Sequence, residues 1–240
     1  TYLTNTAADN VRLWTVASDG TINTTNTYTT GTLYKTIGTD EHSKQTIEYK
    51  DKQGNTILKR VQLSAPADVL NSPSGDGGGW LCTYYIYDIL NNLRCVIQPK
   101  GVQILSSNSF VLSTSLLNEQ CFLYNYDYRN RMIYKKVPGA DPVYMVYDSR
   151  DRLVLIQDGN MRNPTAPKQP YWQFIWYDNI NRPIATGLWT TSTAWVSHIT
   201  AATNSSDYPA QTGGGYQILT RTFYDNYNWL STYAPTLSAT

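Results

Sequence analysis

Residues 126–132 read YDYRNRM, residues 147–153 read YDSRDRL, and residues 177–183 read YDNINRP. The same pattern occurs at 87–93 as YDILNNL and at 224–230 as YDNYNWL. A relative at 50–56, KDKQGNT, has Lys in place of Tyr, and residues 40–44 form a more degenerate copy. Copies that share one internal spacing indicate a repeat architecture, in which each copy is one structural unit.

Each copy has the chemistry of a β-hairpin turn between two strand-like runs. The third residue after the Asp is Gly, Asn or Asp, the residue types that tolerate the positive φ of short hairpin loops. The Asp can accept hydrogen bonds from N–H groups inside the loop, an Arg just beyond the loop lies within reach of that Asp, and the Tyr ring can stack between neighbouring hairpins. The predicted turn residues are Asp51, Gly54, Tyr87, Asp88, Asn91, Tyr126, Asp127, Asn130, Arg131, Tyr147, Asp148, Asp151, Arg152, Tyr177, Asp178, Asn181, Arg182, Tyr224, Asp225 and Asn228.

Composition agrees with an all-β protein. The 240 residues include 20 Tyr and 7 Trp, which fit a pleated surface. Only 15% of residues are charged and the net charge is +1, which argues against a nucleic-acid partner. No apolar run is long enough for a membrane-spanning helix.

The repeated turns resemble the YD repeat of the Rhs family, over roughly residues 33–231. Residues 126–159 and 46–61 are similar to large Rhs/YD-repeat proteins of Bacteroidetes-type bacteria. The resemblance implies consecutive antiparallel hairpins wound into a spiral sheet, part of a hollow shell of the kind seen in Tc-type toxin components and teneurins. It also implies a secreted or surface location, a parent chain whose other repeat segments are the partners, and a C-terminal toxin enclosed by the shell.

This chain departs from complete Rhs proteins after residue 224, where no D-P-x-G-type core region with its self-cleaving acidic residues follows. We therefore expect an internal, non-enzymatic segment that contributes wall to a larger shell. Residues 1–31 are predicted to form an N-terminal strand and linker region, 32–233 the repeat sheet, and 234–240 a tail. The edges of such a segment are expected to self-associate weakly or to be hidden by residues 1–31.

Loops and helices interrupt the repeats. Residues 66–79, 160–170 and 204–215 are rich in Gly or Pro and are predicted to be loops. Two short helices are expected at 113–120 and 193–202, with Ser113 and Ser192 as N-caps.

Few residues point to chemistry. Cys82, Cys95 and Cys121 lack the spacing of a zinc site and are expected to be buried thiols, with a Cys82–Cys95 bridge left open. His42 and His198 are expected to be structural, and no catalytic motif is present. We predict no enzymatic activity, no cofactor and no metal.

The alternative function is carbohydrate binding. Flat aromatic side chains can form platforms for sugar rings, and tryptophans gather in the last third of the chain, at Trp172, Trp176, Trp189, Trp195 and Trp229. Trp172 and Trp176 have an even offset, which places both on one face of a strand. If that face packs against other elements, the residues belong to a core, and if three or more are exposed together, they favour sugar binding.

Overall fold

The computed structural model describes residues 1–63, 79–165 and 169–224. These form two compact units, residues 1–141 and 142–240, which are described in turn. The predicted loop at 66–79 and tail at 234–240 fall outside the described residues except for Gly79, as do Asp225, Asn228 and Trp229.

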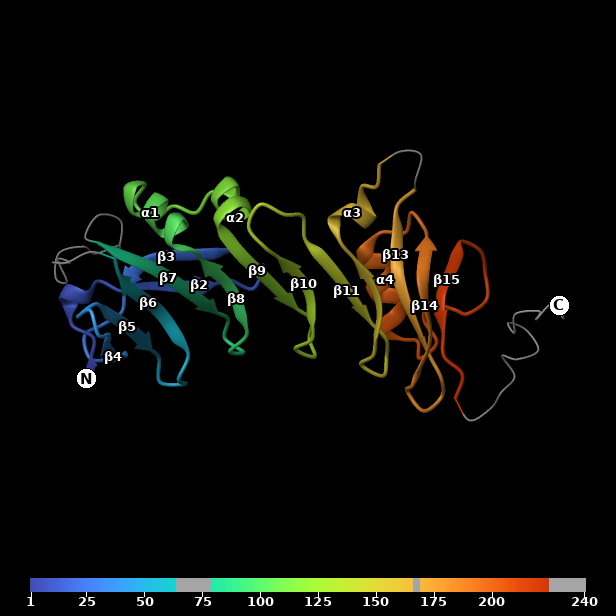
Figure 1. Ribbon diagram of the computed structural model, residues 1–240, viewed down its shortest axis with the longest axis horizontal. Coiled ribbons are helices and arrows are strands. Elements are labelled where there is room, and N and C mark those ends of the chain that lie inside the picture. Colours follow the sequence, from blue (N-terminus) through green and yellow to red (C-terminus); the bar gives the residue numbers. More distant parts are fainter. Residues whose placement is uncertain (64–78, 166–168, 225–240) are drawn as a thin grey trace, which may run out of the picture. The chain divides into compact units, whose positions relative to one another are not determined.

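The first unit is an antiparallel sheet whose strands follow the chain (Figure 1). Its strands are β1 (Tyr2–Thr4), β4 (Tyr34–Thr39), β5 (Gln45–Lys50), β6 (Thr56–Gln62), β7 (Trp80–Tyr87), β8 (Leu93–Ile97), β9 (Cys121–Tyr126) and β10 (Met132–Lys136). From β4 on, each strand pairs with the next one. Alternate residues along β7 are buried, as expected for a sheet with one covered face.

One face of this sheet is covered by segments that lie outside the repeats. They are the 3₁₀ turn Ala7–Asp9, the separate hairpin of β2 (Arg12–Val16) and β3 (Ile22–Thr27), and helices α1 (Pro99–Ser107) and α2 (Thr114–Gln120). The core contains Trp14 of β2, Tyr84 of β7, and Val102 and Leu105 of α1. Residues 1–31 therefore contribute to the core of the first unit.

The second unit repeats the arrangement with β11 (Val143–Tyr147), β12 (Leu153–Gln157), β13 (Tyr171–Tyr177), β14 (Pro183–Thr190) and β15 (Tyr216–Arg221). These strands also pair in chain order. Helix α3 (Gly159–Arg162) follows β12, and α4 (Trp195–Thr203) packs on β11. The prediction of an all-β fold built from consecutive antiparallel hairpins with a few short helices is confirmed.

The predicted helix at 113–120 is present, and the Ser113 side chain accepts a hydrogen bond from the N–H of Leu116 at 3.2 Å. The predicted helix at 193–202 starts two residues late, at Trp195. Ser192 as its N-cap is wrong, because the N-cap position is Ala194, which has no side-chain acceptor. Helix α1 was not predicted, and α3 overlaps the predicted loop at 160–170, beginning one residue before it.

All three cysteines are buried, as expected, and none forms a disulfide, so the Cys82–Cys95 bridge that the sequence left open is absent. Cys95 instead lies beside Cys121, and a hydrogen bond with Cys121, together with burial, raises the pKa of its thiol.

Candidate functional site

The most regular feature of the structure is the turn that joins consecutive strands. In each described turn the backbone N–H of the Asp donates to the carbonyl of the fourth residue after it. The N–H of the third residue donates to the Asp carbonyl, and the N···O distances of both bonds are 2.9–3.2 Å. Asp Oδ1 accepts the N–H groups of the second and fourth residues, as in the turn at Asp127 at 2.9 and 3.0 Å. The same bonds occur in the turns at Asp40, Asp51, Asp88, Asp148 and Asp178.

The third residue after each Asp has the left-handed backbone that the sequence predicts. The φ values are 91° at Gly54, 67° at Asn91, 59° at Asn130, 63° at Asp151 and 68° at Asn181. Ser43 has a φ of 60° in the degenerate copy at 40–44, which is therefore a complete turn of the same kind. The positive φ explains why small or amide residues occupy this position.

The second carboxylate oxygen of the Asp accepts a hydrogen bond from the side chain of the fourth residue in the turns at Asp51, Asp88, Asp127, Asp148 and Asp178. Arg131, Arg152 and Arg182 pair with their own turn Asp at 2.6, 2.6 and 2.7 Å. In the turn at Asp88 a more distant residue, Arg94, supplies the guanidinium at 3.3 Å. Burial alone would raise the pKa of Asp88, but the N–H of Asn92 and the Arg94 guanidinium lower it below its ordinary value.

The fourth residue of one turn also contacts the next hairpin. Asn92 Nδ2 donates to Asn130 Oδ1 at 3.2 Å, and Arg152 Nη1 donates to Asn181 Oδ1 at 3.1 Å. Asn55 Nδ2 donates in the same way to Asn91 Oδ1. At Asn91, Asn130 and Asn181 the left-handed residue therefore has a second role, because its side-chain oxygen accepts a hydrogen bond from the preceding hairpin.

At two repeats the Tyr before the Asp adds a further contact with the preceding hairpin. Tyr177 donates its hydroxyl to the carbonyl of Leu153 at 2.9 Å, and Tyr224 donates to the carbonyl of Pro183 at 3.2 Å. Each acceptor is the fifth residue after the Asp of the preceding turn. The Arg152 guanidinium lies 4.8 Å from the centre of the Tyr177 ring, and Arg182 lies 4.2 Å from that of Tyr224. The predicted Tyr stacking is thus a contact of the ring with the Arg of the preceding hairpin. We call this set of side-chain contacts between successive turns the turn ladder.

Of the tryptophans proposed as a sugar platform, Trp172 and Trp176 are buried, and Trp189 and Trp195 are half-buried. Trp172 and Trp176 do share one face of β13, together with Phe174, but that face is buried. Trp172 meets His198 of α4 edge to face, Trp189 stacks on Tyr216, and Trp195 stacks on Tyr144. The even spacing placed these rings in the core of the second unit because α4 covers that side of the strands.

The two histidines differ. His42 is exposed in the turn at Asp40, where its N–H donates to Asp40 Oδ1. His198 is completely buried between Trp172 and Trp189, and its Nδ1 lies 2.5 Å from the Tyr208 hydroxyl. Burial lowers the pKa of His198 to about 4, so the ring is neutral at pH 7.

A buried ionic network near the N-terminus was not predicted. Asp9 accepts hydrogen bonds from Lys35 Nζ at 2.6 Å and from the Tyr49 hydroxyl at 2.7 Å, and the Asp9 carbonyl accepts from Arg60 Nη2 at 2.7 Å. Burial opposes ionisation, but the hydrogen bonds from Lys35, Thr6 and Tyr49 lower the pKa of Asp9 overall. The network joins the N-terminal segment to β4, β5 and β6, and no sequence pattern marks Asp9 for it.

Within the described ranges, no group of His, Cys, Asp and Glu has the geometry of a metal site. None of the helices described has the length and hydropathy needed to cross a membrane.

No protein-family model and no curated protein matches the chain. Among solved structures, the crystal structure of TcdB2-TccC3 is 16% identical with a TM-score of 0.48, and the match covers 76% of this chain and 8% of that one. A structure of the Photorhabdus luminescens Tc holotoxin pore is 15% identical with a TM-score of 0.46, and the match covers 77% of this chain and 8% of that one. This chain thus spans 8% of the length of these proteins, and the similarity concerns the fold alone.

Proposed function

We propose that this chain is a non-enzymatic structural segment of a larger Rhs/YD-repeat protein, whose role is to extend a sheet of hairpins. The turn ladder carries the proposal. An enzyme needs a catalytic carboxylate at one position. Here the equivalent Asp carboxylate accepts the same backbone hydrogen bonds in every described turn. Repetition of this kind serves stability and geometry, since each repeat contacts its neighbours.

The ladder also supports a role in joining repeats in series. At the third position Asn130 and Asn181 accept hydrogen bonds from the fourth residue of the preceding turn. The Tyr177 and Tyr224 hydroxyls donate to the carbonyl of the fifth residue after the preceding turn's Asp. One hairpin is therefore the docking surface for the next, in the direction of the chain. We further propose that such repeats form the wall of a β-shell around a C-terminal polypeptide of the parent, which the sequence resemblance implies.

Equivalent substitutions in three turns test the structural role of the Asp. Asp88→Ala, Asp127→Ala and Asp148→Ala should each lower the free energy of unfolding, by about 1–3 kcal/mol, because each leaves loop N–H groups without their acceptor. Urea midpoints give the three values, and pairs from non-adjacent turns should add to within about 0.5 kcal/mol. One Asp whose replacement raises stability while the others lower it would contradict the structural role, because that behaviour is typical of a functional site.

The proposal that the shell encloses a C-terminal polypeptide can be tested separately. In the intact parent, the polypeptide inside the shell should resist proteases until this segment is destabilised by the paired Asp→Ala changes. Cleavage of that polypeptide at the same rate in both proteins would argue against enclosure.

A further inference from the structure

The turn at Asp51 lacks a cation that other turns hold. In the turn at Asp148, the Arg152 guanidinium pairs with the carboxylate at 2.6 Å and lies 4.8 Å from the centre of the Tyr177 ring in the next hairpin. The turn at Asp178 holds the guanidinium of its own Arg in the same way, at 2.7 Å from the carboxylate and 4.2 Å from the centre of the next Tyr ring. A turn carboxylate and the Tyr ring that follows it therefore form a two-sided site for a guanidinium.

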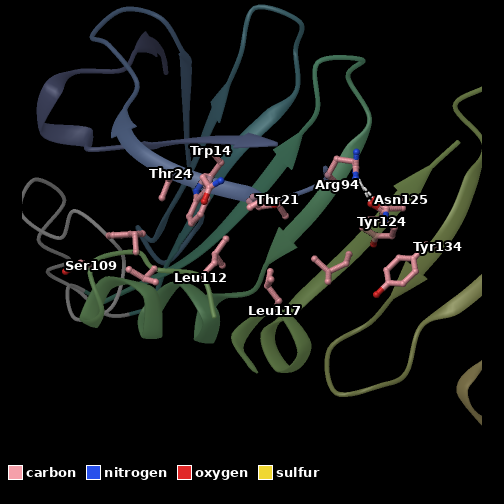
Figure 2. A pocket seen from close by; sticks show the side chains of 16 residues that line it. Trp14, Thr21, Thr24, Arg94, Ser109, Leu112, Leu117, Tyr124, Asn125 and Tyr134 are labelled. Carbon is pink, nitrogen blue, oxygen red and sulfur yellow. Dashed lines mark hydrogen bonds between the residues drawn. The ribbon is translucent and has the colours of Figure 1, made fainter. Parts of the chain in front are cut away.

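The turn at Asp88 obtains its cation from a different position. Arg94, the sixth residue after the Asp, supplies the guanidinium at 3.3 Å. Figure 2, which is drawn around a separate pocket that Arg94 also lines, shows this side chain reaching toward β9. In the turn at Asp51 the fourth and sixth residues are Asn55 and Ile57, so neither supplies a cation.

A pocket of about 420 Å³ lies beside Asp51, within the range of about 300–1,000 Å³ that is usual for ligand sites. Its lining includes Tyr28 of the N-terminal segment and Tyr87, the Tyr that follows this turn, and contains no Lys or Arg among the described residues. Asp51 Oδ2 accepts a hydrogen bond from the Asn55 amide at 2.9 Å, and within the described ranges no cation pairs with this carboxylate. The pocket therefore has the carboxylate and the Tyr of the two-sided site without a guanidinium.

The electrostatics of the pocket favour a positively charged ligand. Asp51, Tyr28 and Tyr87 are half-buried. Burial, and after it the negative charge of Asp51, raises the pKa of both tyrosines, so the carboxylate acts on two hydroxyls that are neutral at pH 7. A partly buried carboxylate without a counter-ion is costly in free energy, and a cation offsets that cost. Ile89 and Leu90 also line the pocket and are 96% and 61% exposed, so a ligand can reach it from solvent.

We propose that this pocket binds the guanidinium group of an arginine. The Asp51 carboxylate accepts hydrogen bonds from it and the Tyr87 ring lies against it, which are the two contacts that Arg152 makes in its own turn. A guanidinium is preferred to an ammonium, because its planar fork bonds a carboxylate at two points and stacks on an aromatic ring. Ile57 and Leu90 line the same pocket and suit the methylene stem of the side chain. The site is independent of the proposed structural role of the repeats, since its ligand comes from outside the chain.

Chemical-shift NMR on the full chain tests this site with N-acetylarginine amide as the probe. N-acetylcitrulline amide is the comparison, because its urea group has nearly the same shape and no charge. We expect the arginine compound to bind with a dissociation constant of about 1 mM, at least about tenfold more tightly than the citrulline compound, and to shift the amide signals of the turns at Asp51 and Asp88. Equal affinity for the two compounds, or no binding of the arginine compound at about 10 mM, would overturn the proposal.

Free arginine identifies the source of the guanidinium. N-acetylarginine amide has the neutral main chain of a polypeptide, whereas free arginine carries a carboxylate and an ammonium group. Tighter binding of the amide supports an arginine side chain of a partner polypeptide. Equal or tighter binding of free arginine supports a small molecule with the same guanidinium group.

Variants locate the site. Asp51→Asn keeps a side-chain oxygen for the loop N–H groups and removes the charge, and should weaken binding at least about tenfold. Asp127→Asn is the matched control, because that turn already holds Arg131, and it should leave binding unchanged. Asn55→Arg supplies the cation from the chain itself, so it should abolish binding and raise the urea midpoint, and it tests the site even if Asp51→Asn fails to fold. Unchanged binding by Asn55→Arg, or equal loss in Asp51→Asn and Asp127→Asn, would exclude this pocket as the site.

Discussion

Where the left-handed residue of a turn is Asn, it satisfies two constraints together. Its backbone has a positive φ, and its side-chain oxygen accepts a hydrogen bond from the preceding hairpin, as Asn130 does from Asn92. Gly meets the first constraint alone, as at Gly54, and a β-branched residue meets neither. This explains why Asn occupies the position in several copies, a preference for which the sequence alone shows only the φ requirement.

We predict that Asn130→Val lowers the free energy of unfolding by about 1–3 kcal/mol, because Val cannot adopt this backbone without strain. Asn130→Gly should cost less, since only the side-chain contact is lost. Urea denaturation measures both. Asn26→Val, at an exposed position within β3, is the control and should change stability by less than about 0.5 kcal/mol. If Asn130→Val is as stable as the wild type, the turn does not depend on this conformation.

His198 should make stability depend on pH. Its folded-state pKa of about 4 lies below the ordinary value of 6.5, so the unfolded chain binds more protons between these values. Stability should therefore fall as pH decreases from about 7 to about 4, by up to about 3 kcal/mol. Below pH 4 a second loss is expected, as Asp88, with its lowered pKa, is protonated.

Urea midpoints at pH 7, 6, 5 and 4, followed by tryptophan fluorescence, measure this dependence. His198→Phe removes the titrating group and should flatten the curve between pH 7 and pH 4. His42→Gln, at the exposed histidine, should leave the wild-type curve unchanged. If His198→Phe retains the full slope, the pH dependence comes from other groups.

At the scale of the element, the hairpin is the unit that the sequence describes best. The backbone bonds within a turn join residues at most four apart, and in three turns the Arg is the fourth residue after the Asp, so seven residues carry the full signal there. The hydrogen bonds of the turn ladder join residues 24 to 41 apart, such as Asn92 and Asn130. The sequence does not reveal side-chain pairs at that separation along the chain, because they meet only once the order of the strands in the sheet is known.

The helices show where local signals fail. Helix α2 was predicted because Ser113 is a residue type that is common at the N-cap. Helix α1 begins with Pro99 at its first turn, a recognised start signal, but contains Gly101, which lowers helix propensity. Gly101 is needed because a Cβ there would lie 2.9 Å from Ile97 and 3.0 Å from Gln120. Tertiary packing therefore selected a residue that weakens the sequence signal.

A double-mutant cycle tests whether the turn ladder couples neighbouring hairpins. Asn92→Ala and Asn130→Gly remove the two ends of one hydrogen bond, and their stability changes should deviate from additivity by about 0.5–1 kcal/mol. Asn55→Ala with Asn130→Gly is the control, because these hairpins are not adjacent and the changes should add. Equal additivity in both pairs would mean that the contact between hairpins adds no stability.

At the scale of the whole molecule, the strand edges determine how the chain meets other polypeptides. In the first unit, β1 pairs with β4 from Tyr34 to Thr36, and the N-terminal amine donates to the Ile37 carbonyl at 2.8 Å. The N-terminal segment thus covers part of that edge. This is the second of the two outcomes predicted for the edges, which were weak self-association or covering by residues 1–31. In the second unit, β15 pairs only with β14 among the described strands, and Leu219 on it is 58% exposed.

A regular edge strand with exposed apolar side chains is a template for pairing with another chain. We therefore predict weak self-association of the isolated chain through β15, seen as a mass that rises with concentration in sedimentation or light scattering. Leu219→Lys should abolish this rise, because a charge on an edge strand disfavours pairing with a second edge. Leu90→Lys is the matched control: Leu90 is 61% exposed but lies in the turn at Asp88, so its replacement should leave association unchanged. If the wild type stays monomeric from micromolar to millimolar concentration, or if both variants act alike, β15 is not the edge through which this chain extends its sheet.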